Sequence, residues 1–392
     1  MEWVEKKSSE LYVSSSGLSK SSDQFGYGYP FLSYKDVFNN YYAPDKLSTL
    51  VNSTEKDRMK CSVKQGDVFL TRTSETTDEL GMSCVALHDY VNATFNGFTK
   101  RLRPLTDEIE PKYAAYYFRS PYFRSQCISL ASLITRASLN DGMIRRLKIR
   151  YPLNRKVQEK IGEILYTYDT LIENNTKRIR LLEKMAENLY TEWFVRFRFP
   201  GHENVEMENG LPKGWKVKKY EDELNVKYGK GLPTDKLTKD GFPVFGSNGQ
   251  IGYYTSYMYD TPQILISCRG ASSGVVNISL PKSFITNNSL ICEMTNKTES
   301  VFEYLKYYFL NTNLVQYQTG SAQPQITINN IVKLKLLIPS TDIQIKFADK
   351  VRTLDKEVGN LQLQNSLLAR QRDLLLPRLM SGKLEVKEEV LE

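Results

Sequence analysis

Two stretches of the chain carry apolar residues at alternating spacings of three and four, which is the pattern of a coiled-coil seam. The second set begins 186 residues after the first and keeps that offset at every position but one. One asparagine interrupts each seam, Asn175 and Asn365, and such residues tend to fix the register of a coiled coil. We therefore predict two long helices that bury each other, with two separately packed amphipathic helices as the alternative. The predicted seams consist of Ile161, Leu165, Tyr168, Ile172, Ile179, Leu182, Met185 and Leu189, and of Phe347, Val351, Leu354, Val358, Leu361, Leu368 and Leu375.

The segments outside these helices have a different pattern. Residues 1–143 and 201–338 are rich in Gly, Tyr, Thr and Asn, and they contain short β-branched runs such as 263–266 and 275–278. Turn signals such as Asn248-Gly249 and Ser273-Gly274 separate these runs. The pattern predicts mixed α/β domains with many loops, so the fold class is α+β. The alternating residues 193–199, followed by Pro200-Gly201, predict an extended connector.

Short motifs recur in the same order in both halves of the chain, which indicates an internal repeat of about 195 residues. We therefore predict a first globular domain at 1–150, a first spacer helix and connector at 151–200, a second globular domain at 201–339, and a second spacer helix and tail at 340–392. The matched segments are 3–7 with 215–219, 29–32 with 242–245, 67–74 with 264–270, 116–118 with 307–309, and 144–152 with 331–339.

Composition excludes several classes of protein. The 392 residues are 41% hydrophobic and 25% charged, which lies in the globular range and excludes wholesale disorder. No apolar run approaches the roughly 20 residues needed to span a bilayer, and the charged first ten residues do not form a secretory signal. We expect a cytoplasmic protein.

The residues that usually carry catalysis or bind metal are scarce. The five cysteines are widely spaced without a CxxC pair, and there are two histidines, so we expect no metal site. No phosphate-binding loop, dinucleotide fingerprint, HExxH or GxSxG motif occurs. The acidic or Asn residue followed by two prolines and an aromatic, found in adenine methyltransferases, is also missing. We expect no catalytic residue in this chain.

The net charge of +8 is concentrated in the middle of the chain. Residues 144–200 hold 13 Lys+Arg and 7 Asp+Glu, whereas residues 1–143 hold 17 of each. Clustered cations are what phosphate binding requires, although a solvated helical face explains the charge equally well.

The order of globular domain, long helix, second globular domain and second long helix resembles the specificity (S) subunit of type I restriction-modification systems. The resemblance covers essentially the whole chain and includes several motifs in order. The first domain departs from it, because its YPFL at 29–32 is not followed by the SNGQIGY of 247–253. The motifs are TEWFVRF at 191–197, Gly214-Trp215, FPVFGSNGQIGY at 242–253 and QPQIT at 323–327.

The resemblance implies a subunit that is not an enzyme. Each globular domain would be a target-recognition domain that reads one half of an asymmetric bipartite sequence in double-stranded DNA. The helices would pair as an antiparallel coiled coil, giving a pseudo-twofold internal repeat, and would dock two methyltransferase subunits. A separate restriction and translocase subunit would cleave the DNA. This chain would need no cofactor; S-adenosylmethionine would be bound by the methyltransferase, and ATP and Mg by the restriction subunit.

Base reading needs Arg, Asn, Gln or hydroxyl side chains on loops that can enter a groove. For each candidate, turn capping or simple solvation is as good an explanation as DNA contact. The seam of the first helix, at about 1.5 Å per residue, would span roughly 43 Å, which is close to one turn of DNA at about 34 to 36 Å. The DNA-binding candidates are Arg72, Thr73, Ser74, Lys100, Arg101, Arg103, Arg136 and Ser138 in the first domain, and Ser247, Asn248, Gln250, Arg269, Ser272, Ser273, Gln323, Gln325 and Thr327 in the second.

The ends of the helices are candidates for partner docking, because apolar residues continue there beyond the seam. Two other functions remain open. One is a coiled-coil adaptor that binds only proteins, which should lack salt-sensitive binding to duplex DNA. The other is an undetected nuclease or methyltransferase, which should bind S-adenosylmethionine or a divalent metal by itself. The docking candidates are Tyr190, Trp193, Phe194, Leu376 and Leu379.

Overall fold

A computed structural model describes residues 2–76, 79–130, 132–133, 137–320 and 323–386. The chain divides into two compact units, Met1–Thr176 with Leu363–Glu392, and Lys177–Gln362. Both divisions fall inside long helices, so each unit contains one globular domain together with a part of each helix.

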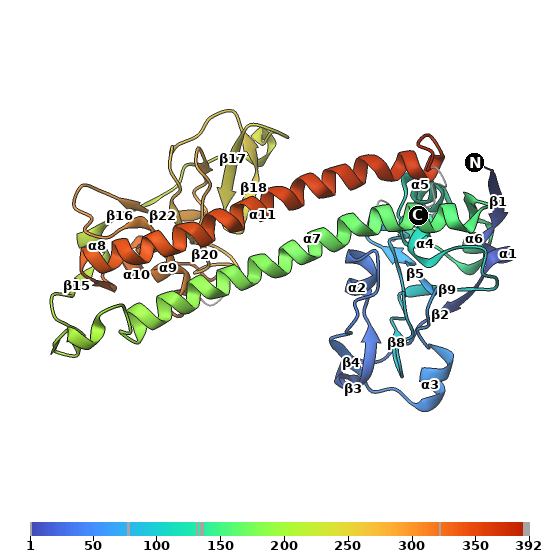
Figure 1. Cartoon of the computed structure of the whole chain (residues 1–392), viewed down its shortest axis with the longest axis horizontal. Helices are drawn as coiled ribbons and strands as arrows, with labels where there is room; N and C mark the ends of the chain where they lie inside the picture. The colour runs from blue at the N-terminus through green and yellow to red at the C-terminus, as the bar shows by residue number, and fades with distance from the viewer. Residues whose placement is uncertain (1, 77–78, 131, 134–136, 321–322, 387–392) are drawn as a thin grey trace, which may run out of the picture. The chain divides into compact units, whose positions relative to one another are not determined.

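The first unit contains a four-stranded antiparallel sheet in the order β2 (Tyr12–Ser16), β9 (Thr99–Pro104), β5 (Val68–Thr71) and β7 (Ser83–Val85). A second sheet joins β4 (Thr49–Val51), β3 (Phe25–Leu32) and β8 (Thr94–Phe95), the last pair being parallel. Strand β1 (Trp3–Lys7) pairs with β12 (Lys148–Pro152), and β6 (Thr73–Ser74), β11 (Ala137–Ser138) and β10 (Ser132–Leu133) form a small sheet. The helices are α1 (Ser8–Leu11), α2 (Tyr34–Asn39), α3 (Glu55–Lys60), α4 (Pro111–Tyr117), α5 (Pro121–Leu130) and α6 (Asp141–Arg146) (Figure 1).

The second unit repeats this plan. Its four-stranded sheet has the order β16 (Leu224–Tyr228), β22 (Ser289–Met294), β19 (Ile264–Ser267) and β20 (Val276–Ile278). Strands β18 (Gly249–Tyr254), β17 (Phe242–Gly246) and β21 (Phe284–Ile285) form the second sheet, again with a parallel pair, and β15 (Lys216–Lys219) pairs with β23 (Lys335–Ile338). A short hairpin joins β13 (Met207–Glu208) and β14 (Leu211–Pro212). The helices are α8 (Tyr220–Glu223), α9 (Phe302–Leu310) and α10 (Ile328–Ile331).

The predicted fold class and internal repeat are therefore confirmed, because strand order and pairing agree between the units. The departure after residue 32 also has a structural cause. In the second domain a turn at Ser247-Asn248 leads directly from β17 to β18. In the first domain α2 lies between the equivalent strands β3 and β4, and Ser33 caps it through a reciprocal bond with Asp36.

The two long helices are α7 (Arg155–Tyr190) and α11 (Thr341–Ser381), drawn in green and red in Figure 1. They run antiparallel in each unit. In the first unit Asp169 pairs with Arg372 and Asn175 with Gln364, and in the second unit Arg178 pairs with Glu357. The predicted seam residues are buried or partly buried, with one exception.

The exception is Met185, which is 56% exposed, while its neighbour Ala186 is buried. The alternation of four and three residues from Ile161 leads from Leu182 to residue 186 and then to Leu189, so the seam position belongs to Ala186 and not to Met185. The prediction of Met185 was wrong by one residue.

The predicted extended connector is wrong in its first part, whereas residues 196–199 lie outside any helix. A π-helical turn, Thr191–Val195, continues α7, and it buries Trp193 and Phe194 in the core of the second unit. The alternating aromatic residues after α7 therefore follow packing against that core and not a strand.

A polar layer interrupts the helix pair of the first unit. The Asn175 amide donates to Gln364 Oε1 and the Asn365 amide donates to Thr176 Oγ1, each at 3.3 Å. Asn365 Oδ1 is buried without a partner among the described residues. Sliding the helices past one another would separate these groups in an apolar seam, so the layer favours one register.

Each globular domain is fastened to its long helix by a buried glutamine. Gln344, near the start of α11, donates to the Pro339 carbonyl and accepts from the Val301 N–H, both at 2.8 Å. Gln158, near the start of α7, makes the equivalent bonds to Pro152 and Glu110 and a third to the Glu108 carbonyl. Neither side chain is exposed to solvent.

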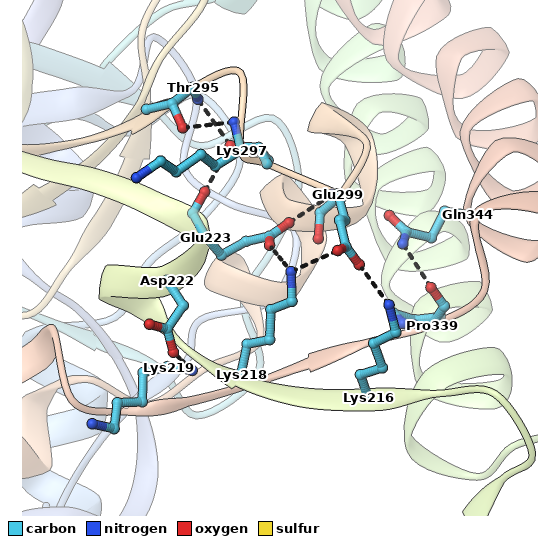
Figure 2. A network of polar contacts seen from close by, with 12 residues as sticks. Lys216, Lys218, Lys219, Asp222, Glu223, Thr295, Lys297, Glu299, Pro339 and Gln344 are labelled. Carbon is cyan, nitrogen blue, oxygen red and sulfur yellow. Dashed lines mark hydrogen bonds and ion pairs between the residues drawn. The ribbon is translucent and has the colours of Figure 1, made fainter.

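A network of ion pairs and hydrogen bonds in the second domain lies next to Gln344 (Figure 2). The buried Glu223 accepts from the Ser300 N–H at 2.7 Å and from Lys218 Nζ at 3.2 Å. Lys218 and Lys216 also pair with Glu299, and they hold the pKa of that carboxyl below its ordinary value. The network joins strand β15 to the loop that precedes α9.

Tyrosines fasten the same elements in both domains. Tyr304 and Tyr308 on α9 donate to carbonyls of β23, and Tyr307 donates to Asp355 of α11 at 2.8 Å. On α4, Tyr113 and Tyr117 donate to carbonyls of β12, and Tyr116 donates to Asp169 of α7. The repeated tyrosines of the sequence therefore position each domain on its helix.

Candidate nucleic-acid interface

Several loops of the second domain are tied together at one end of its sheets. Lys230 N–H donates to the Ile285 carbonyl at 2.9 Å, and Asn287 N–H donates back to the Lys230 carbonyl at 3.1 Å. Cys268 N–H and Ser247 Oγ both donate to the Asn288 carbonyl, at 3.0 and 3.1 Å. Backbone bonds also pair 269–270 with 324–325. We call 229–231, 246–249, 268–270, 286–288 and 323–326 the second loop cluster.

The backbone of the second loop cluster is bonded internally, whereas many of its side chains are not. Arg269 and Lys230 are exposed, and neither has an ion-pair partner in the part of the chain that the structure describes. The remaining exposed side chains are amides, which can donate to one base and accept from it at the same time. The exposed side chains without a hydrogen-bond partner among the described residues are Lys230, Asn248, Arg269, Asn287, Asn288, Gln323 and Gln325.

The first domain has the same arrangement of loops, which we call the first loop cluster: 17–20, 72–74, 96–98 and 137–139. Leu18 N–H donates to the Phe95 carbonyl at 2.8 Å, and Gly97 N–H donates back to the Leu18 carbonyl at 2.9 Å. Arg72 N–H donates to the Phe98 carbonyl at 3.1 Å. These bonds make Leu18 equivalent to Lys230, and Arg72 equivalent to Cys268.

In each loop cluster a glycine lets the backbones of two neighbouring loops come close together. A Cβ on Gly17 would lie 2.3 Å from the Asn96 carbonyl oxygen, and one on Gly229 would lie 2.2 Å from the Thr286 carbonyl oxygen. Both distances are far below van der Waals contact, so only glycine fits. The two domains thus share the backbone arrangement and differ in the side chains that it carries.

The equivalence of the backbone bonds shifts the sequence match between 67–74 and 264–270 by one residue. Thr73 pairs with Ser138 in the first domain as Arg269 pairs with Gln325 in the second. Arg269 is therefore equivalent to Thr73, and not to Arg72, whose side chain is half-buried. Of the other candidates in the first domain, Thr73 and Ser138 lie opposite each other in paired strands. Ser74 is buried and donates to Glu79, and Arg136 lies outside the described residues.

The structure argues against Lys100, Arg101 and Arg103 as phosphate contacts. Lys100 is 4% exposed, and its Nζ lies 2.8 Å from Asp141. Arg101 donates to the Ser62 carbonyl, and burial lowers its pKa. Arg103 is paired with the buried Asp67 at 2.5 Å. These residues belong to strand β9 inside the sheet, where the sequence pattern suggested a loop.

The candidates of the second domain divide into two groups. Asn248, Gln250, Arg269, Gln323 and Gln325 are exposed. The hydroxyl residues are half-buried or buried instead. Ser247 bonds the Asn288 carbonyl, Ser272 is half-buried, Ser273 is buried, and Thr327 caps α10 through Asn330.

Sequence reasoning missed Phe98, Lys230, Asn287 and Asn288. A signal was present, because TFNGFT at 94–99 and FITNNS at 284–289 each follow a short apolar strand with turn residues. Their equivalence depends on pairing with Gly17 and Gly229, which are distant in sequence.

The predicted docking residues are wrong, because all five are buried within the chain. Tyr190, Trp193 and Phe194 belong to the core of the second unit, and Leu376 and Leu379 belong to that of the first. They lie where each helix meets a domain, so the domain covers them. Other apolar residues of the helices are exposed: Ile164, Leu171, Leu181 and Met185 on α7, and Ile345, Leu363, Leu367 and Leu374 on α11.

In the part of the chain that the structure describes, no group of three or more His, Cys, Asp and Glu side chains comes together to bind a metal ion. The described helices include none that is long and apolar enough to cross a membrane.

The loop clusters, their repetition and the long helices define a class of protein with two binding domains on a helical spacer. A model of the type I restriction modification DNA specificity domain matches residues 2–184 and 212–369. The chain belongs to this family, whose members are specificity subunits and not enzymes.

Individual relatives agree with this assignment over nearly their full length. The chain is 26% identical to the type I restriction enzyme MjaIX specificity subunit of Methanocaldococcus jannaschii, covering 99% of this chain and 94% of that protein. It is 21% identical to the HindI specificity subunit of Haemophilus influenzae, covering 90% and 94%. The crystal structure of the S subunit from M. genitalium shares the fold, with a TM-score of 0.59 and 17% identity over 96% of each chain.

Proposed function

We propose that this chain reads an asymmetric, bipartite DNA sequence, with one globular domain on each half. The observation that carries the proposal is the repeated loop cluster. Both domains have the same backbone arrangement, but Arg269 and Gln325 in the second correspond to Thr73 and Ser138 in the first. Different side chains on one backbone are what two different half-sites require.

Helices α7 and α11 set the unread gap between the two half-sites and carry the partner subunits. The polar layer at Asn175 and Asn365 supports a fixed helix register, and a fixed register supports a fixed gap. Two methyltransferase subunits dock on the exposed apolar residues of the helices, including Leu181 and Leu374. Restriction and translocase subunits join this complex.

The chemistry belongs to these partners. Methyl transfer uses S-adenosylmethionine in the methyltransferase subunit, and cleavage uses ATP and Mg in the restriction subunit. This chain contributes the choice of sequence, and its own residues bind no cofactor.

Methylome sequencing tests the proposal. DNA would be taken from cells that express this chain with its cognate methyltransferase subunit, and from cells that lack this chain. We expect methylated adenines in one bipartite motif with a constant gap, which disappears without this chain. Absence of any such motif, although the complex forms, would refute DNA reading and favour a protein adaptor.

A substitution in one loop cluster makes the test sharper. Arg269→Ala should relax one half of the motif by about 1–3 kcal/mol of discrimination at a base pair, and leave the other half unchanged. Lys297→Ala removes an exposed cation of the second domain that lies beyond the other end of β22 and outside the second loop cluster, so it is the matched control and should leave both halves unchanged. Equal loss of both halves after Arg269→Ala would contradict reading by separate domains.

A further inference from the structure

Phe98 is an exposed aromatic residue in a turn whose backbone is held firmly. Its side chain is 57% exposed. Its N–H donates to Asn96 Oδ1 at 2.7 Å, and its carbonyl accepts from the Arg72 N–H at 3.1 Å. Thr99 Oγ1 closes the turn on the Asn96 carbonyl at 2.7 Å. A rigid turn that exposes a phenylalanine gives up the burial of a large apolar group.

The equivalent residue in the second domain is an amide. Arg72 N–H donates to the Phe98 carbonyl as Cys268 N–H donates to the Asn288 carbonyl. Likewise, Gly97 N–H and Asn287 N–H bond equivalent loops. Phe98 and Asn288 therefore occupy the same backbone position, and both are exposed.

The residues around Phe98 are also less polar than the residues around Asn288. The paired strands β6 and β11 carry the hydroxyls of Thr73 and Ser138 in the first loop cluster, whereas Asn288 belongs to a cluster with Arg269 and Gln325. Among the described residues Phe98 has no ring contact with another aromatic side chain. The first loop cluster is thus poorer in amide and cationic donors and contains an apolar group at its exposed edge.

In the major groove a base pair can be distinguished by hydrogen bonds or by the methyl group of thymine. Phenylalanine contacts that methyl, whereas asparagine bonds the edge of adenine. The position shared by Phe98 and Asn288 can therefore switch between these two modes of reading without any change in the backbone.

We propose that Phe98 is a specificity-determining residue that recognises a thymine methyl in the half-site of the first domain. Asn288 reads a base edge by hydrogen bonding at the equivalent place in the other half-site. This inference rests on the proposed function and adds to it the chemical group that is recognised.

The first experiment is methylome sequencing of the complex with Phe98→Ala. One base pair in one half of the motif should lose about tenfold of its discrimination, while the other half and the gap stay the same. Leu105→Ala is the matched control. Leu105 is 54% exposed, and it follows the far end of the six-residue strand β9, about 20 Å along the chain from Phe98.

The second experiment removes the methyl group instead of the ring. Binding of the whole complex is measured on duplexes that carry deoxyuridine in place of each thymine of the motif in turn. Wild type should bind one uracil duplex several-fold more weakly, at the position that Phe98→Ala relaxed. The Phe98→Ala complex should no longer distinguish thymine from uracil there.

Three results would overturn the proposal. The motif of Phe98→Ala could be unchanged, or no uracil substitution could weaken wild-type binding in the relaxed half. Binding could also fall equally on every sequence, which is what a residue that only supports the fold or general affinity would do. Failure of the proposed function is distinct, because then no motif would depend on this chain at all.

Discussion

Replacing Gln344 by leucine tests how the second domain is held on α11. The side chain is fully buried, and it bonds the Pro339 carbonyl and the Val301 N–H at 2.8 Å each. Leucine has nearly the same volume but neither polar group. The substitution therefore leaves a carbonyl and an N–H without their partner, one of them buried and the other partly buried.

The expected loss follows from these two groups. An unsatisfied buried polar group costs about 1–3 kcal/mol, so we assign about 2 kcal/mol to the Pro339 carbonyl and about 1 kcal/mol to the Val301 N–H. The free energy of unfolding of the second unit should fall by about 3 kcal/mol. Gln158→Leu removes three such bonds in the first unit and should cost that unit more.

Urea unfolding followed by tryptophan fluorescence measures the loss of free energy of unfolding in the second unit. Trp193 and Trp215 are both buried in the core of the second unit. Hydrogen exchange of residues 301–310 gives a local measure, because the Val301 N–H loses its acceptor. Gln362→Leu, an exposed glutamine on the same helix, is the matched control and should change stability by less than about 0.5 kcal/mol.

The reasoning would be refuted by a loss below about 1 kcal/mol, or by an equal loss in Gln362→Leu. Either outcome would mean that water or a shifted backbone satisfies the two groups. In that case the glutamine would not be the fastening between domain and helix.

Three further predictions concern other parts of the chain. Asn365→Leu should raise the melting temperature followed by circular dichroism, because a buried Oδ1 that has no partner among the described residues is removed from an apolar seam; a lower melting temperature would contradict this. Lys6 and Tyr151 hold the pKa of Glu108 below its ordinary value of 4.5, so the stability they contribute is present above pH 4.5 and is lost as the pH falls through the lowered pKa. Glu108→Gln should therefore flatten the acid limb of the stability curve measured by urea unfolding, and an unchanged limb would count against the pair. Lys230→Gln should reduce the slope of log binding constant against log salt by about 1 for the whole complex on DNA, because one phosphate contact is lost; an unchanged slope would contradict this.

The sequence alone was enough to predict the helices and the repeat, because both depend on local periodicity. Apolar residues every three or four positions specify a helix with a narrow buried face, and Ile161 and Phe347 are indeed fully buried. The repeated tyrosines at 116–117 and 307–308 were visible as a motif. The partners of Tyr116 and Tyr307, Asp169 and Asp355, were not visible, because they lie about 50 residues away along the chain.

Tertiary structure decided which polar residues are free to bind. Lys100 and Arg269 are both cations near strand ends in the sequence, but one is buried against Asp141 and the other is exposed. The difference arises from sheet pairing, which brings together residues that are far apart in the chain. The same pairing makes Phe98 and Asn288 equivalent, because each accepts a backbone bond from the residue that follows a distant strand, and is not placed by its neighbours in sequence.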